Sequence, residues 1–88
     1  MNKNQLISAI KSLIKEKSDN KTYYFGEDCF ASLWCNDEQT MTKLHKVFIK
    51  KDVLYITITD WLGTDDEKVS VFDTDEIEMF YNKIKNNE

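Results

Sequence analysis

The sequence predicts an α+β fold, in which two terminal helices pack on one face of an antiparallel sheet. Three observations predict it. Apolar residues recur at helical spacing near both ends of the chain, and the segment between them alternates with the period of a strand. The 88 residues contain no proline and no low-complexity linker. We therefore expect one domain over residues 1–88, a two-layer sandwich with four or five strands.

The first helix is predicted by its start signal and its apolar stripe. Asn2 is a candidate cap with Gln5 three residues later, the spacing of a capping box. The polar run at 18–21 is expected to end the helix. The apolar positions that follow the cap and form the stripe are Leu6, Ile7, Ile10, Leu13 and Ile14.

The second helix is predicted near the C-terminus by a similar signal. Asp73 and Glu76 have capping-box spacing, and Phe72 and Ile77 can form the matching hydrophobic staple. The acids of the DTDE run lie where the positive end of a helix dipole favours negative charge. The apolar stripe of this helix consists of Ile77, Phe80, Tyr81 and Ile84.

Strands are expected throughout the middle of the chain. Residues 22–25 and 29–35, separated by a glycine-containing loop, predict a first hairpin. Alternation over 47–58 predicts a second hairpin around a two-residue loop at Lys51 and Asp52. That loop would pair Ile49 with Leu54, Phe48 with Tyr55 and Val47 with Ile56. A helical interpretation of Met41, Leu44, Val47 and Phe48 is the alternative, and residues 68–72 predict a last strand.

The two faces of this sheet differ in character. The face under the helices is expected to carry Val47, Ile49, Leu54, Ile56, Ile58, Val69 and Val71. The opposite face would carry Phe48, Tyr55, Thr57, Thr59 and Trp61, with Lys46 and Lys50 at its edge. Exposed aromatic residues of this kind often mark contact surfaces. Cross-strand pairing within the hairpin is the alternative explanation for the aromatic residues.

Charge is distributed unevenly along the chain. The formal net charge is −4, and all 12 basic residues are lysine. Without arginine the bidentate fork that grips phosphates and guanine edges is missing, so we do not expect direct nucleic-acid binding. Residues 60–78 contain eight acids against Lys68 alone, a local net charge of −7. An exposed acidic patch of Asp60, Asp65, Asp66 and Glu67, the last three expected in a loop, is the basis of an alternative function.

Signatures of catalysis and of cofactor or metal binding are absent from the sequence. It has no phosphate-binding glycine motif and no HExxH motif, and His45 is the single histidine. Cys29 and Cys35 share one face of a strand with Ala31 and Leu33, so we expect reduced core thiols, with a disulfide or metal site as the alternative. We expect no enzyme, no cofactor and no metal, and we expect a soluble, cytoplasmic protein because signal-peptide and membrane-span patterns are missing.

The segments KVFIKKDVLYITITDWLGTDDEKVSVFDTDEIEMFYNKI and NQLISAIKSLIKEK resemble small uncharacterised proteins of gut Bacteroidetes and their mobile elements. The likeness covers most of the chain. It implies an α+β fold and carries over no functional residue. In size and charge alone the chain is also similar to phage-type inhibitors such as anti-CRISPR proteins.

Two functional hypotheses follow from the sequence. The first is a protein that binds a protein partner, or a second copy of itself, through Phe48, Tyr55, Thr57 and Trp61 on the open sheet face. The second is an acidic mimic of nucleic acid that uses Asp60, Asp65, Asp66 and Glu67 to occupy the nucleic-acid groove of a host protein.

Overall fold

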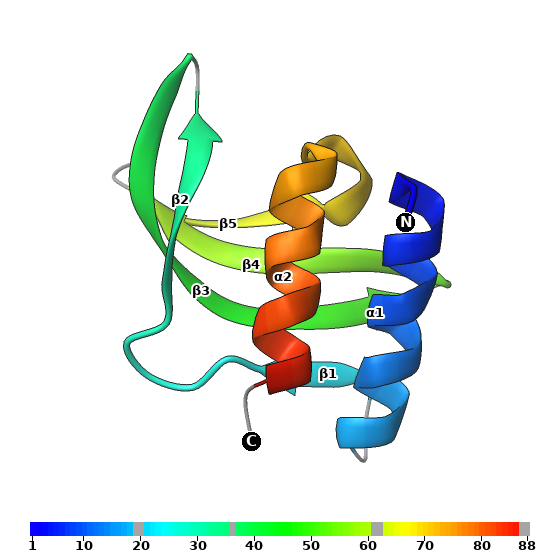
Figure 1. Ribbon diagram of the computed structural model, residues 1–88. Coiled ribbons are helices and arrows are strands. Elements are labelled where there is room, and N and C mark those ends of the chain that lie inside the picture. Colours follow the sequence, from blue (N-terminus) through cyan, green and yellow to red (C-terminus); the bar gives the residue numbers. More distant parts are fainter. Residues whose placement is uncertain (19–20, 36, 61–62, 87–88) are drawn as a thin grey trace.

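The computed structural model describes residues 1–18, 21–35, 37–60 and 63–86 and confirms the predicted α+β architecture. Two helices lie side by side on one face of a five-stranded antiparallel sheet (Figure 1). The sheet order is β1-β3-β4-β5, and β2 pairs with β3. In chain order the elements are α1 (Lys3–Lys17), β1 (Thr22–Tyr24), β2 (Phe30–Cys35), β3 (Glu38–Lys50), β4 (Val53–Asp60), β5 (Gly63–Lys68), the 3-10 turn η1 (Val69–Val71) and α2 (Thr74–Asn86).

Helix α1 begins at the capping box that the sequence predicts. The Asn2 side chain accepts a hydrogen bond from the Gln5 amide at 2.9 Å, and the Gln5 side chain accepts one from the Asn2 amide at the same distance. Leu6, Ile10 and Ile14 are buried on the face that meets the sheet and α2. The cap and the apolar stripe therefore determine where α1 starts and which face it buries.

Helix α2 begins with half of the predicted capping box in place. Oε1 of Glu76 accepts a hydrogen bond from the Asp73 amide at 3.2 Å. The buried stripe is Ile77, Phe80 and Ile84. At the other end, Nζ of Lys17 donates to the carbonyls of Ile84 and Lys85 at 2.8 and 2.9 Å. A cation from α1 thus satisfies the free carbonyls at the negative end of the α2 dipole.

The hairpin of β3 and β4 has the predicted register. Ile49 faces Leu54, Phe48 faces Tyr55 and Val47 faces Ile56. Its two-residue turn places Lys51 and Asp52 in the left-handed region, with φ of 51° and 64°. Positive φ at both central positions is the geometry that matches the right-handed twist of the two strands.

The predicted hairpin between residues 22–25 and 29–35 is wrong. Both β1 and β2 pair with β3, at Lys46–Phe48 and at Glu38–Lys43. The 13-residue β3 is long enough to offer its edge to both strands, with a register irregularity between Leu44 and Lys46 that separates the two stretches. Periodicity within 22–35 predicts the strands but not the partner, because the partner lies later in the chain.

The prediction of a last strand at 68–72 and of an acidic loop before it is also wrong. The acidic residues Asp65, Asp66 and Glu67 belong to β5, which pairs with β4 as an edge strand. Charged side chains are well tolerated there, since one side of an edge strand faces solvent. The valines that follow form η1, in which Val69 is buried but Val71 is 64% exposed, so Val71 does not join the apolar sheet face.

One hydrophobic core lies between the helices and the sheet. Thr42 is buried in it as well, and Cys29 is a free cysteine packed against its edge. Within the described part of the chain, no helix is both long enough and apolar enough to cross a membrane. The core consists of Leu6, Ile10, Ile14, Phe25, Ala31, Leu33, Leu44, Val47, Leu54, Ile56, Ile58, Val69, Phe72, Ile77, Phe80 and Ile84.

Candidate functional site

The sheet face opposite the helices is the first candidate surface, and we call it the outer face. Alternation along each strand assigns residues to it: buried Val47, Ile56 and Ile58 point to the helices, so their neighbours point away. The outer face carries Thr22 and Tyr24 of β1, Phe30, Ser32 and Trp34 of β2, Gln39, Met41, Lys43, Lys46, Phe48 and Lys50 of β3, Val53, Tyr55, Thr57 and Thr59 of β4, and Thr64, Asp66 and Lys68 of β5.

The two predicted aromatic residues of the outer face pair with each other. The rings of Phe48 and Tyr55 stack with centroids 5.4 Å apart and an interplanar angle of 17°. Nζ of Lys46 lies 5.3 Å from the centre of the Phe48 ring. Both aromatic residues are partly buried. The pair therefore stabilises the β3–β4 hairpin and at the same time presents a firm apolar surface.

Polar side chains of the outer face are bonded to one another. Thr57 is buried, and its hydroxyl donates to Oδ1 of Asp66 at 2.7 Å. The Thr59 hydroxyl bonds to Nε2 of His45 and to the Thr64 hydroxyl. Because Thr57 is buried, it stabilises the pairing of β4 with β5 and is not available to contact a partner. The fourth predicted contact residue, Trp61, lies outside the described residues.

Four exposed apolar side chains of the outer face are not predicted from the sequence. Tyr24 and Met41 are each 68% exposed, Trp34 is 55% exposed and Phe30 is 46% exposed. Tyr24, Phe30 and Trp34 lie on β1 and β2, which the sequence predicts to pair with each other, and Met41 precedes the predicted strand at 47–58. The available signal was alternation, since Tyr24 and Phe30 lie beside buried Phe25 and Ala31.

The outer face carries more basic than acidic side chains. Lys43, Lys46, Lys50 and Lys68 share it with a single described acid, Asp66, which is engaged by Thr57. The outer face is thus apolar and basic, although the chain as a whole is acidic.

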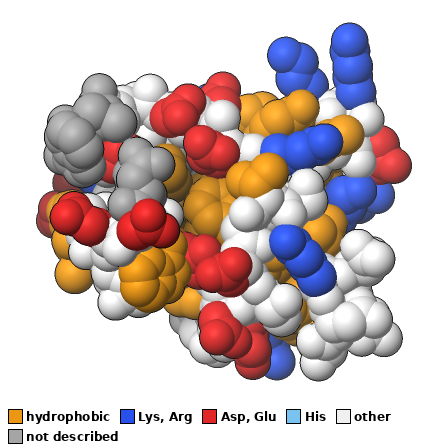
Figure 2. Space-filling view, turned by 90° about the horizontal axis from the view of Figure 1, so that it is seen from above, with side chains coloured by type: hydrophobic (Ala, Val, Ile, Leu, Met, Phe, Trp, Pro, Cys, Tyr) orange, Lys and Arg blue, Asp and Glu red, His pale blue; other side chains and the backbone are white. Residues whose placement is uncertain are grey.

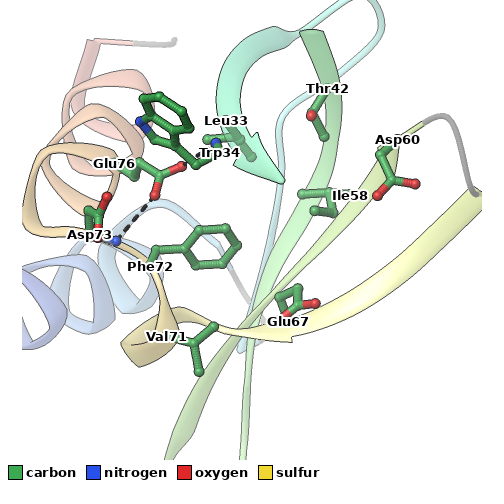
Figure 3. Close-up of a pocket in the computed structure, with 10 residues that line it drawn as sticks. All are labelled: Leu33, Trp34, Thr42, Ile58, Asp60, Glu67, Val71, Phe72, Asp73 and Glu76. Carbon is green, nitrogen blue, oxygen red and sulfur yellow. Dashed lines mark hydrogen bonds between the residues drawn. The ribbon is translucent and has the colours of Figure 1, made fainter. Parts of the chain in front are cut away.

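A second candidate surface is a cleft where α2 begins, and we call it the α2 cleft. Its cavity of about 320 Å³ has an apolar floor and acidic walls. Figure 3 shows the side chains that surround it, and Figure 2 shows apolar side chains with acidic ones around them at this end of the molecule. The floor is made of Leu33, Thr42, Ile58 and Phe72, and the walls are Trp34, Asp60, Glu67, Val71, Asp73 and Glu76.

Repulsion between carboxylates shapes the electrostatics of the α2 cleft. Burial raises the pKa of Glu67 above its usual 4.5, and the nearby charges of Asp65 and Asp60 raise it further. The register places Asp65 and Glu67 on the helix side of β5 and Asp66 on the outer face. The four acids predicted as one patch therefore do not lie on one face.

A contact across the α2 cleft ties the sheet to the helix. Oε2 of Glu76 accepts a hydrogen bond from the Trp34 amide at 3.2 Å, and Oε1 accepts one from the Asp73 amide. Trp34 is 55% exposed beside this bond. The sequence predicts the contact between Asp73 and Glu76, which are three residues apart. It contains no signal for the bond between Glu76 and Trp34, which are 42 residues apart.

A metal centre would need several histidine, cysteine or acidic side chains that converge on one point. Within residues 1–18, 21–35, 37–60 and 63–86, no three histidine, cysteine or acidic side chains converge as metal ligands. Comparison of the chain with protein-family models, curated proteins and solved structures found no match. Any functional conclusion therefore depends on the two surfaces themselves.

Proposed function

We propose that this protein is a non-enzymatic binding module that contacts a protein partner through its outer face. The observation that carries the proposal is the exposure of Tyr24, Phe30 and Met41 on the same face as the stacked pair of Phe48 and Tyr55. An apolar core of aromatic and methionine side chains with a charged rim is the composition of protein interfaces. Sheet pairing explains Phe48 and Tyr55 but leaves the exposed side chains without a structural role.

The charge of the outer face favours a different protein over a second copy. A symmetric dimer would bring the same lysines of two outer faces together, and this repulsion would oppose association. A partner with acidic side chains around an apolar patch would complement Lys43, Lys46 and Lys50. We place this contact in the cytoplasm, in keeping with the expectation from the sequence.

The nucleic-acid mimic receives less support from the geometry. A mimic would need a row of carboxylates on one accessible surface, comparable to the phosphates of a nucleic-acid backbone. The side chains of β5 instead alternate between its two faces, and Asp66 already accepts a hydrogen bond from Thr57. We therefore rank this function second.

The test is quantitative capture of proteins from the native cell by the tagged protein and by a Tyr24→Ser, Met41→Ser variant. Both side chains are exposed, so the variant should fold. We expect it to lose at least about tenfold of the captured partner, the scale on which interface anchors contribute.

The matched control is Met1→Ser in an N-terminally tagged protein, which removes a 73% exposed apolar side chain that lines neither candidate surface. Capture by this variant should equal that of the unchanged protein. A partner lost equally from both variants, or retained by the Tyr24→Ser, Met41→Ser variant, would contradict binding through the outer face.

A further inference from the structure

Strand β2 is an edge of the sheet. Among the described residues it pairs with β3 alone. An edge strand has a row of backbone amides and carbonyls that no sheet partner uses, and such a row can pair with an added strand. The direction in which the groups of each β2 residue point is fixed by the register.

The outward-pointing residues of β2 can be identified from two hydrogen bonds. The Leu44 amide donates to the Cys29 carbonyl at 2.8 Å, so Cys29 points its backbone at β3. In an antiparallel ladder these bonds fall on alternate residues. Phe30, Ser32 and Trp34 must therefore point their amides and carbonyls away from β3. The bond from the Trp34 amide to Glu76 of α2 agrees with this parity.

Two cavities lie along this edge, between β2 and α2, and we call them together the groove. Next to Phe30 a cavity of about 520 Å³ reaches Lys83 and Asn86 near the end of α2. Beside Ser32 and Trp34 a cavity of about 210 Å³ reaches Met79 and Glu76. The α2 cleft continues past Trp34. Strand and helix thus form two walls, with apolar surface from Phe30, Trp34 and Met79.

The two ends of the groove differ in charge. At its Trp34 end the described lining includes Asp73, Asp75 and Glu76 and no lysine. The adjoining α2 cleft adds the carboxyl groups of Asp60 and Glu67. At the Phe30 end Lys83 offsets part of the charge of Glu27 and Asp28. A bound cation is therefore favoured at the Trp34 end.

We propose that the groove between β2 and α2 binds an extended peptide segment of a protein partner, with a lysine or arginine side chain in the acidic end beside Trp34. The peptide would add to β2 as a further strand and bond to the backbones of Phe30 and Ser32, since Glu76 already holds the Trp34 amide. Its basic side chain would lie among Asp73, Asp75 and Glu67, with its apolar stem against Trp34. The groove shares Phe30, Ser32 and Trp34 with the outer face, but neither Tyr24 nor Met41 lines it.

The proposal also predicts the polarity of the peptide. An antiparallel added strand places its N-terminal end beside Trp34, because β2 runs from Phe30 to Cys35. The probes are the blocked peptides Ac-KTVTVT-NH2 and Ac-TVTVTK-NH2, which have the same composition. Titrated into the ¹⁵N-labelled protein, the first should give saturable shifts at the Phe30, Ser32 and Trp34 amides and bind about threefold or more tightly than the second.

Two variants separate backbone pairing from charge. Ser32→Pro removes an outward amide that β3 does not use, so the sheet should persist while binding of the first peptide falls about tenfold. Glu67→Gln should weaken that peptide about twofold to fivefold, whereas Glu16→Gln, on exposed α1 surface, should not.

Several results would overturn the proposal. The first is the absence of saturable shifts at β2 with about 5 mM peptide, which is near the weak end expected for a short segment. The second is equal affinity of the two peptides. The third is unchanged binding in a folded Ser32→Pro variant. Shifts at β2 that depend on protein concentration without peptide would show that a second copy covers the edge. All of these outcomes are independent of Tyr24 and Met41, so failure here leaves the outer-face proposal intact.

Discussion

At the scale of single residues, Glu67 is a carboxylate held where its charge is unfavourable. Burial, Asp65 and Asp60 all raise its pKa, so folding favours its protonated form. Its stabilising contribution is fully present below the ordinary pKa of 4.5 and is lost as the pH rises through the higher pKa of the folded state. At neutral pH the ionised Glu67 therefore lowers the free energy of unfolding.

Replacement of Glu67 by glutamine should remove this cost. We expect the free energy of unfolding at pH 7 to rise by about 0.5 kcal/mol, a magnitude typical of solvent-screened charges. The advantage should shrink as the pH falls below 4.5, where Glu67 of the unchanged protein is protonated in both states. Urea titrations at pH 7 and pH 4 measure both values. A variant that is less stable than the unchanged protein at pH 7 would contradict the assignment.

Glu76 is the residue whose two oxygens join the start of α2 to β2. Glu76→Ala should lower the free energy of unfolding by about 1 kcal/mol, because it removes both a helix-start bond and a bond to the sheet. Hydrogen exchange should locate the second bond: the Trp34 amide should exchange about tenfold faster. Glu78→Ala, at an exposed position of the same helix, is the control. Equal Trp34 exchange in the two variants would exclude the contact.

At the scale of elements, the β3–β4 turn uses residues that do not suit its backbone. Lys51 and Asp52 both have positive φ, for which asparagine and glycine are better suited. A Lys51→Asn, Asp52→Gly variant should raise the free energy of unfolding by about 0.5 to 1 kcal/mol.

Among the described residues, the turn variant loses only one weak interaction, the ion pair between Lys11 and Asp52. The ion pair between Lys11 and Asp52 spans 3.8 Å and involves a 93% exposed carboxylate, so it contributes little. The shorter bond, 2.7 Å from Nζ of Lys11 to the Asp52 carbonyl, is retained in the variant. Thermal unfolding measures the gain, and a lower midpoint would show that the exposed pair outweighs the backbone strain.

Elements whose partners are near in sequence could be predicted, and those with distant partners could not. The helices and the β3–β4 hairpin are specified by caps, stripes and alternation within about fifteen residues. Strand β5 is specified by its neighbour: GTDDEK has low strand propensity but pairs with the apolar β4. Likewise β1 and β2 find their partner in β3, and periodicity in their own residues carries no information about that choice.

The same limit applies to the candidate site. Alternation was enough to predict that Phe48, Tyr55 and Thr57 share one face. It does not predict that Thr57 is buried by its bond to Asp66, or that β1 and the first half of β3 add Tyr24 and Met41. Exposure depends on which strands lie side by side, and that is a property of the assembled sheet.

At the scale of the whole molecule, the two layers separate two kinds of surface. Helices cover one side of the sheet (Figure 1) and leave the outer face, with its lysines and exposed apolar side chains, on the other. Acidic side chains gather where α2 begins (Figure 2). An outer face that contacts an acidic partner should bind less tightly as salt is added, because screening shortens the reach of its lysines. The apolar contacts of Tyr24 and Met41 should persist, so binding should weaken without being abolished.

Site-specific photo-crosslinking tests the outer-face contact most directly. A photoreactive benzoylphenylalanine placed at Met41 in the native cell should crosslink to a protein partner, because this side chain is 68% exposed on the outer face. The same group at Ser12, on the exposed surface of α1, should give no such product. A partner crosslinked from Ser12 and not from Met41 would contradict the account.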